Sequence, residues 1–189
     1  MRKVKQVKMG GITFGDGMVR VQSMLSVPST DIAGSVRQAM ALEKAGCEII
    51  RAAIPNEEAV ALIPAIKEQV SVPLVADHFD YRLALMAVEA GIDKIRINPG
   101  NIGSDDRVKA VADACRSHGI PIRIGVNAGS LEKHILAKYG APVPEALVES
   151  ALYHVSLLER FDFDDIVISI KSSNVQTMIA AYRLLAEKC

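Results

Sequence analysis

Short runs of aliphatic and β-branched residues alternate along the chain with longer stretches in which apolar residues recur at helical spacing. The short runs predict strands at residues 19–24, 48–53, 73–78, 94–99, 121–126 and 165–170. The longer stretches predict helices at residues 32–45, 57–69, 82–90, 107–118 and 176–188. Regular alternation of this kind is typical of βα units arranged around a parallel sheet.

Residues that favour helix ends stand at the expected boundaries. Side chains able to accept hydrogen bonds from a first helical turn precede three helices, namely Thr30 or Asp31, Asn56 and Ser104. Glycines that favour a left-handed helix end come before three strands, at Gly46, Gly91 and Gly119. These signals support the boundaries that the hydrophobic pattern predicts.

The connection after the fifth strand is longer than the others. Residues 127–139 predict a short helix capped by Ser130, and Pro142 and Pro144 introduce a second helix that runs to about Arg160. Long connections after strands tend to lie on the active face of βα folds. We therefore expect this segment to border a site.

The number of strands narrows the fold class. A TIM (β/α) barrel has eight parallel strands and typically about 250 residues, whereas this chain of 189 residues provides about six βα units. An open six-stranded α/β domain is the alternative. We favour an incomplete TIM barrel, because an open sheet would leave its first and last strands as unprotected edges.

Composition and charge exclude several classes of protein. The chain has 22 basic and 22 acidic residues and no net charge, which argues against nucleic acid or a membrane surface as a partner. It has no apolar run of roughly 18 residues and no signal-peptide pattern at its start, so we expect a cytoplasmic protein. The three cysteines show no metal-binding spacing, and we expect no metal site in this chain.

The candidate chemistry lies on one face of the strands. Side chains alternate between the two faces of a strand, so the aliphatic residues of each strand share one face and polar residues share the other. If the aliphatic face meets the helices, Arg51, Arg96, Arg123 and Lys171 point into the barrel. Enclosed cations repel one another, and a bound phosphate-bearing polyanion would resolve that repulsion. The alternative is pairing with acids or contact with solvent, and Asp77 could neutralise one of the cations.

Two turns extend this pattern. The segment Asn98-Pro-Gly-Asn-Ile-Gly follows Arg96 directly, and Asn127-Ala-Gly-Ser follows Arg123. Glycine-rich turns before helices offer backbone N–H groups to anions, although the same residues serve ordinary tight turns. Among the histidines, His78 at the end of a strand is the best candidate for acid–base chemistry, whereas His118, His134 and His154 lie on helices and are expected at the surface.

Several long phrases resemble one known family. They are VQSM at 21–24, AGCEIIR at 45–51, PLVADHFDYRLAL at 73–85, KIRINPGNIG at 94–103, IRIGVNAGSLEKHILAKYG at 122–140 and ISIKSS at 168–173. These phrases look like the N-terminal barrel of the 4-hydroxy-3-methylbut-2-enyl diphosphate synthases. The resemblance covers essentially the whole chain.

The resemblance implies an activity for the full-length family. Its members reductively open 2-C-methyl-D-erythritol 2,4-cyclodiphosphate to 4-hydroxy-3-methylbut-2-enyl diphosphate in the non-mevalonate pathway of isoprenoid biosynthesis. Electrons come from ferredoxin or flavodoxin through a [4Fe-4S] cluster, which three Cys and one Glu of a C-terminal domain hold. Family members are homodimers. Residues 1–189 would then be the substrate-binding barrel domain, without the cluster domain, and would perform no reduction alone.

The resemblance also assigns roles to particular residues. Arg51, Arg96, Arg123, Asn127 and Lys171 match positions that bind the diphosphate, and Asn98 accompanies Arg96 in its motif. His78, Asp77 and Ser172 match supporting positions of the pocket. The family usually has ADIHFDY where this chain has ADHFDY at 76–81, so one residue between Asp77 and His78 is absent. Adjacent residues of a strand face opposite ways, so either Asp77 or His78 leaves the pocket, or the backbone distorts locally to keep both there.

Two other functions remain compatible with the sequence. One is a different enzyme on a related barrel, either dihydropteroate synthase-like or a Schiff-base lyase with Lys171 as nucleophile. The other is a non-catalytic domain that binds a phosphorylated metabolite. All three interpretations share one prediction, which is an anion held at the strand ends.

Overall fold

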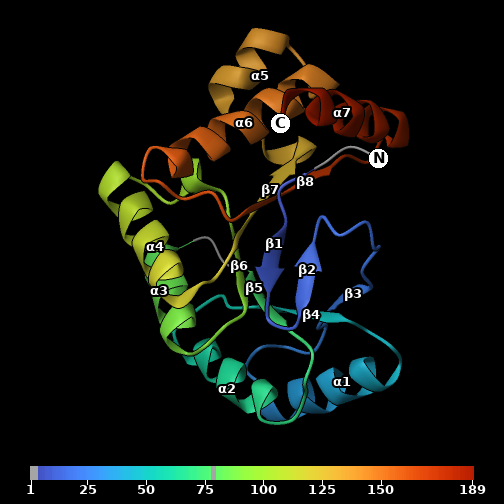
Figure 1. The fold of residues 1–189 in the computed structure, drawn as a ribbon, viewed down its shortest axis with the longest axis vertical. Coiled ribbons are helices and arrows are strands. Elements are labelled where there is room, and N and C mark those ends of the chain that lie inside the picture. Colours follow the sequence, from blue (N-terminus) through green and yellow to red (C-terminus); the bar gives the residue numbers. More distant parts are fainter. Residues whose placement is uncertain (1–3, 78–79) are drawn as a thin grey trace.

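A parallel sheet of six strands forms the centre of the computed structural model, which describes residues 4–77 and 80–189 (Figure 1). The strands are β3 Gln22–Met24, β4 Ile49–Ala53, β5 Leu74–Asp77, β6 Lys94–Ile97, β7 Ile122–Asn127 and β8 Ile166–Lys171. Each strand pairs with the next one along the chain. Parallel strands in chain order are the arrangement of a βα barrel. The prediction of an incomplete TIM barrel is confirmed, with β3 and β8 at the two edges of the described sheet.

Helices connect the strands and cover one face of the sheet (Figure 1). They are α1 Ile32–Lys44, α2 Leu62–Lys67, α3 Tyr81–Glu89, α4 Asp105–His118, α5 Lys133–Tyr139, α6 Pro144–Glu159 and α7 Val175–Lys188. Shorter 3-10 turns are η1 Glu58–Ala61, η2 Pro99–Asn101 and η3 Ala128–Ser130. The main core lies between these helices and the aliphatic face, where Ile50, Ile95 and Ile124 are fully buried. The polar face of the strands therefore faces the barrel interior.

Helix caps follow the sequence signals except at Ser104, which precedes α4 without a side-chain capping hydrogen bond, and at Ser130. Asp31 caps α1 by accepting a hydrogen bond from Gly34 N at 2.8 Å, and Gly119 ends α4 in the left-handed conformation with a φ of 64°. The prediction that Ser130 caps the helix after β7 was wrong. Asn127 accepts from Gly129 N at 3.2 Å and folds the next residues into the separate turn η3, so α5 begins only after Glu132.

An N-terminal hairpin, which the sequence analysis did not predict, closes one end of the interior. Its strands β1 Val7–Met9 and β2 Ile12–Phe14 pair in antiparallel fashion. Met9 packs on Ile49 and Val75, which are inward residues early in β4 and β5. This second apolar cluster fills the amino-terminal end of the strands. Access to the polar residues is left at the carboxyl-terminal end.

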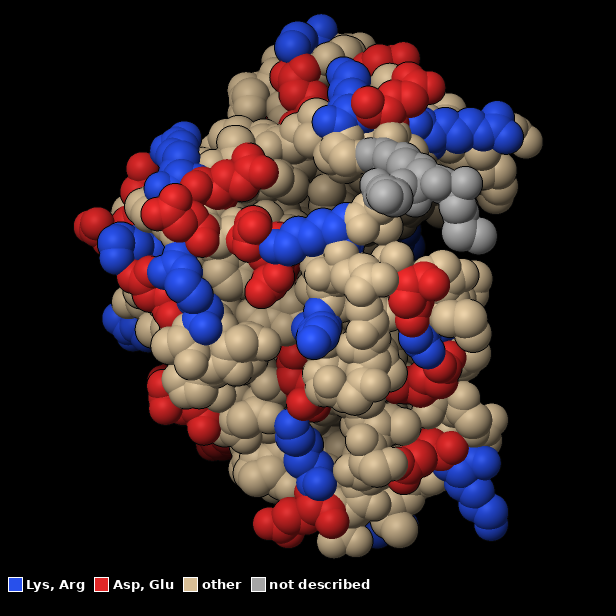
Figure 2. All heavy atoms as spheres, in the orientation of Figure 1, with Lys and Arg blue, Asp and Glu red and all other residues tan. Residues whose placement is uncertain are grey.

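The charged surface carries no broad field of one sign on the face viewed in Figure 1. Lys and Arg are mixed there with Asp and Glu (Figure 2), in keeping with a formal net charge of zero. Within residues 4–77 and 80–189, none of the helices combines the length and the apolar character that crossing a bilayer requires. Any strong attraction for an anion must therefore arise locally.

Candidate functional site

A polar cavity of about 370 Å³ opens at the carboxyl-terminal ends of the strands. Its lining residues are Arg51, Asp77, Arg96, Asn98, Asn101, Arg123, Gly125, Val126, Asn127, Ser130, Ser169 and Lys171. Strands β4 to β8 and the turns after β6 and β7 all contribute. The structure thus brings together the four cations that alternation along the strands predicts.

The register of the sheet explains why these side chains converge. Arg96 lies directly between Asp77 and Arg123 on its two neighbouring strands. Asn127 lies opposite Lys171 in the same way. Residues in register on parallel strands share a face, so one inward row forms at one height of the barrel. Charged side chains from separate parts of the chain therefore meet in one small volume.

Asp77 holds two of the arginines. Its Oδ2 pairs with Arg51 Nη2, and its Oδ1 lies 3.3 Å from Arg96 Nη1. The expectation that Asp77 could neutralise one cation agrees with this arrangement, because its two oxygens contact two guanidinium groups but carry a single negative charge between them. Among the residues that line the cavity, four cations face this one carboxylate. The cavity is therefore strongly electropositive.

Arg123 is the least satisfied of these cations. Its Nε donates to Ser169 Oγ at 3.0 Å, but its buried Nη1 has no hydrogen-bond partner among the residues that the structure describes. Burial lowers the pKa of Arg123, and repulsion from Arg51 and Arg96 lowers it further. A buried donor without a partner is costly to a fold. An anion in the cavity would satisfy both the donor and the charge.

The two asparagines have different local roles. Asn98 is buried and bonds the backbone of Gly125 twice, donating to its carbonyl and accepting from its N–H at 3.0 Å each. It thereby fixes the end of β6 against β7. Asn127 orders η3 through Gly129, while exposed Lys171 stands opposite it at the cavity mouth. Asn98 thus makes two hydrogen bonds to the backbone while it lines the cavity, whereas Lys171 faces solvent and any incoming ligand.

One predicted site residue, Ser172, is described by the structure and does not line the cavity. Its Oγ instead accepts from Asn174 N at 3.2 Å in the turn before α7. Ser172 adjoins Lys171, and neighbouring residues in extended chain point opposite ways. His78 lies outside the described residues. Asp77 lines the cavity. It does so although this chain lacks the residue that the family usually has between the aspartate and the histidine.

Gly125 is required where Arg96 crosses β7. Arg96 Nη2 donates to Gly125 O at 2.9 Å, and a Cβ atom at Gly125 would lie only 2.5 Å from Arg96 Nε. A Gly125→Ala variant is therefore expected to displace the Arg96 guanidinium. We expect binding of inorganic pyrophosphate to weaken by about 1.5–3 kcal/mol, or roughly ten- to hundredfold.

Isothermal titration calorimetry would measure this loss. Gly129→Ala is the matched control, because its Cβ atom would approach nothing closer than Asn127 Oδ1 at 3.8 Å. Since only the end of a flexible side chain must move in Gly125→Ala, the midpoint of thermal unfolding is expected to change little. Equal affinity of Gly125→Ala and the unmodified chain for pyrophosphate would show that Arg96 does not contribute to binding.

Sequence reasoning missed Lys94 and misplaced His154. Lys94 shares the inward face of β6 with Arg96, is 1% exposed, and places its Nζ 4.1 Å from the centroid of the Phe14 ring. Alternation along the strand identifies it as readily as Arg96. His154 was expected at the surface and is fully buried. That prediction was wrong because His154 falls on the same face of α6 as Leu147, Ala151 and Leu158, and this face packs into the core.

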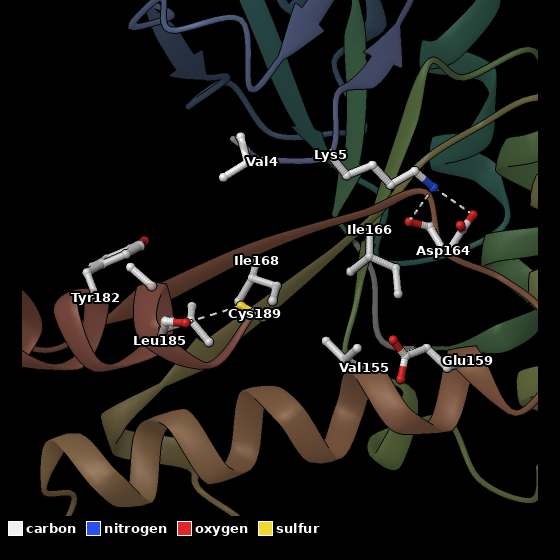
Figure 3. Close-up of a pocket in the computed structure, with 11 residues that line it drawn as sticks. Val4, Lys5, Val155, Glu159, Asp164, Ile166, Ile168, Tyr182, Leu185 and Cys189 are labelled. Atoms are coloured by element: carbon white, nitrogen blue, oxygen red, sulfur yellow. Dashed lines mark hydrogen bonds and ion pairs between the residues drawn. The ribbon is translucent and has the colours of Figure 1, made fainter. Parts of the chain in front are cut away.

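A larger cavity of about 460 Å³ lies elsewhere and has a different character. Figure 3 shows Tyr182 and Leu185 of α7 beside Ile168 of β8, with Lys5 reaching Asp164 at its rim. The Lys5 Nζ to Asp164 Oδ1 distance is 2.7 Å. Its lining is mainly apolar and follows the edge strand β8. It lacks the converging cations that a phosphate group requires, so the smaller polar cavity is the candidate site.

The described residues do not fit an iron–sulfur cluster. Within residues 4–77 and 80–189, no group of three or more His, Cys, Asp or Glu side chains comes together to hold a metal. Cys47 is buried in the connection between α1 and β4, Cys115 is buried on α4, and Cys189 is exposed. Burial also raises the pKa of the Cys115 thiol to about 12, which disfavours the thiolate that metals bind.

Comparisons with a family model and with curated proteins point to the same family. Residues 4–189 match the family model described as the GcpE TIM-barrel domain. A curated 4-hydroxy-3-methylbut-2-en-1-yl diphosphate synthase (flavodoxin) of Fusobacterium nucleatum is 55% identical over 97% of this chain and 51% of its own length. The enzyme of that name from Clostridium perfringens is 53% identical over 99% of this chain and 54% of its own length. The chain thus spans about half the length of the curated relatives it matches.

Solved structures add a likeness in fold alone. A dihydropteroate synthase from Yersinia pestis superposes with a TM-score of 0.67 over 97% of this chain and 70% of its own, at 14% identity. One from Vibrio fischeri gives a TM-score of 0.66 over 98% of this chain and 73% of its own, at 15% identity. Identity this low leaves the shared barrel as the only conclusion.

Proposed function

Because the chain belongs to the GcpE TIM-barrel domain family, we propose that it is the substrate-binding barrel of a 4-hydroxy-3-methylbut-2-enyl diphosphate synthase. The reaction is the reductive ring opening of 2-C-methyl-D-erythritol 2,4-cyclodiphosphate to 4-hydroxy-3-methylbut-2-enyl diphosphate in isoprenoid biosynthesis. The main support is the cavity itself, where Arg51, Arg96, Arg123 and Lys171 surround a volume of about 370 Å³. The names of the curated relatives agree with this substrate class.

Each group in the cavity has a part in holding the diphosphate. Arginine binds phosphate oxygens through a planar fork, and lysine contributes a point charge. Arg123 Nη1 and Arg51 Nε have no hydrogen-bond partner within residues 4–77 and 80–189, and both are donors that can bind such oxygens. Asn127 and Ser130 supply neutral polar contacts at the mouth. His78 is proposed as a further supporting residue, whereas Ser172 is left out of the set because it does not line the cavity.

The redox chemistry belongs to other parts of the proposed enzyme. A [4Fe-4S] cluster would supply the two electrons, and the described residues of this chain do not provide its ligands. Flavodoxin is the proposed electron donor, in keeping with the names of the relatives, and ferredoxin is the alternative. We further propose a cytoplasmic homodimer in which residues 1–189 form the N-terminal substrate-binding domain.

The alternative functions have weaker support. The likeness to dihydropteroate synthases concerns the fold, at 14% identity. A Schiff-base lyase needs a lysine with a lowered pKa in an enclosed site, whereas Lys171 is exposed at the cavity mouth. A non-catalytic domain that binds a phosphorylated metabolite would use the same arginines, and turnover by the full enzyme distinguishes it from the proposed function.

Binding and turnover test the proposal separately. The chain is expected to bind 2-C-methyl-D-erythritol 2,4-cyclodiphosphate in isothermal titration calorimetry and to leave it unchanged in the presence of reduced flavodoxin. A chimera in which residues 1–189 replace the matching half of the Clostridium perfringens relative is expected to convert the cyclic diphosphate, as detected by mass spectrometry of the product. Absence of binding by the chain, together with an inactive but folded chimera, would rule the proposal out.

A further inference from the structure

A buried imidazole connects two turns that border the polar cavity. His154 lies on α6 and is fully buried. Its Nδ1 accepts a hydrogen bond from Gly100 N at 3.0 Å, and its Nε2 lies 2.6 Å from Glu132 Oε1. Gly100 belongs to the turn at residues 98–103, here called the Gly100 loop, and Glu132 ends the Ser130 loop at residues 127–132. One side chain therefore joins segments from two different βα connections.

The hydrogen-bond pattern determines which tautomer the neutral His154 ring adopts. Gly100 N can only donate, so His154 Nδ1 must carry a lone pair and the ring proton of the neutral form resides on Nε2. That proton is donated to Glu132 Oε1. Burial by itself raises the pKa of Glu132, but hydrogen bonding, chiefly from His154, lowers it to about 2. The carboxylate thus remains a charged acceptor at neutral pH and orients the ring.

Both connected loops supply residues to the cavity. Asn101 adjoins Gly100, Ser130 stands two residues before Glu132, and both of them line the cavity. The contact at Gly100 is close, since a Cβ atom there would lie 2.9 Å from His154 Cε1. A glycine at this position lets the backbone approach the ring. The link is thus built into the packing of the loop as well as into its hydrogen bonds.

We propose that His154 and Glu132 are positioning residues, which hold the Gly100 loop and the Ser130 loop at the spacing that one diphosphate group requires. The inference rests on the proposed function, because it assumes that the cavity binds such an anion. Neither residue lines the cavity, so both act through the loops. Groups that are pre-positioned for a ligand avoid the loss of conformational entropy on binding.

Three variants with inorganic pyrophosphate as the probe test this proposal. His154→Phe keeps a planar aromatic ring and removes both hydrogen bonds, and it is expected to weaken binding by about tenfold or more. Glu132→Gln keeps an acceptor for His154 Nε2 and is expected to weaken binding by less than about threefold. Leu158→Ala is the matched control, because it removes a fully buried side chain one turn further along the same helix and leaves the hydrogen bonds of His154 to both loops in place. It is expected to lower thermal stability and leave affinity unchanged.

A second measurement distinguishes positioning from general stabilisation. Hydrogen exchange of the Gly100 amide is expected to accelerate in His154→Phe and to remain slow in Glu132→Gln. If His154→Phe does not fold, Glu132→Ala takes its place, since that side chain is at the loop end of the link.

The outcomes separate the two proposals. Wild-type affinity in a folded His154→Phe variant, or an equal loss in Leu158→Ala, would refute the positioning role and leave the proposed function intact. Failure of the unmodified chain to bind both pyrophosphate and the cyclic diphosphate would refute the proposed function and the positioning role with it.

Discussion

Replacement of Arg123 with alanine is expected to weaken binding of the cyclic diphosphate by about 2–5 kcal/mol, or roughly thirty- to several-thousandfold. Arg123 is buried beside two other arginines, and among the described residues its Nη1 has no hydrogen-bond partner. Its interactions within the protein are thus weaker than those of Arg96, which pairs with Asp77 and Gly125. A phosphate oxygen would gain a charged donor that the fold leaves unused.

The effect on stability is expected to be opposite in sign. Removing a charge that is buried among like charges relieves repulsion, so the free energy of unfolding of Arg123→Ala is expected to equal or exceed that of the unmodified chain. Calorimetry and urea unfolding together would measure both quantities. Arg37→Ala, on the exposed side of α1, controls for loss of an arginine elsewhere. A loss of binding below about 0.5 kcal/mol for both Arg96→Ala and Arg123→Ala would mean that the anion binds elsewhere.

Replacement of Lys94 with methionine is expected to stabilise the fold at neutral pH by about 1–4 kcal/mol, as hydrophobic replacement of a buried charge often does. Lys94 is 1% exposed and faces the Phe14 ring of the hairpin. Burial lowers the pKa of Lys94 to about 7, and repulsion from Arg123 and Arg51 contributes. Methionine has a similar length and lacks the charge, so the hairpin contact is kept.

The gain is expected to depend on pH in a defined direction. The pKa of Lys94 is about 7 in the folded chain and close to 10.5 in the unfolded chain. Between these values the unfolded chain binds more protons, so the contribution of Lys94 to the free energy of unfolding rises with pH, by up to about 1.4 kcal/mol per unit. The advantage of Lys94→Met is therefore greatest at and below pH 7 and disappears toward pH 10.5.

Urea unfolding of both chains at several pH values between 6 and about 10 would measure this difference. Lys109→Met is the control, because the Lys109 side chain is 57% exposed and pairs with Asp113 on the surface of α4. A constant difference between Lys94→Met and the unmodified chain across this range would show that Lys94 titrates normally.

Alternation along the strands was the most informative feature of the sequence. It placed Arg51, Arg96, Arg123 and Lys171 on one face, and the structure brings all four to a single cavity. The reason is physical, since a strand has a fixed period of two and helices can cover only its apolar face. Glycines and caps such as Asp31 located the helix ends for equally local reasons.

Features that depend on distant segments were harder to predict. The burial of Lys94 depends on the hairpin, whose strands have three residues each and whose signal is a Gly10-Gly11 turn between alternating residues. The burial of His154 depends on which face of α6 meets the sheet, and its partners come from two loops. The double pairing of Asp77 depends on side-chain geometry across three strands. Patterns within one short segment of sequence cannot predict such contacts between distant segments.

The shared carboxylate of Asp77 also bears on which anions the cavity would select. Asp77 is already the counter-ion of Arg51 and Arg96. An incoming ligand therefore meets four cations and one carboxylate, which is a surplus of three positive charges. A ligand with a single negative charge gains little by competing with Asp77 for the same donors, whereas one with several charges can engage Arg123 and Lys171 as well. The cavity would then select ligands by their number of negative charges. Singly charged metabolites of similar size would bind weakly even where their shape fits.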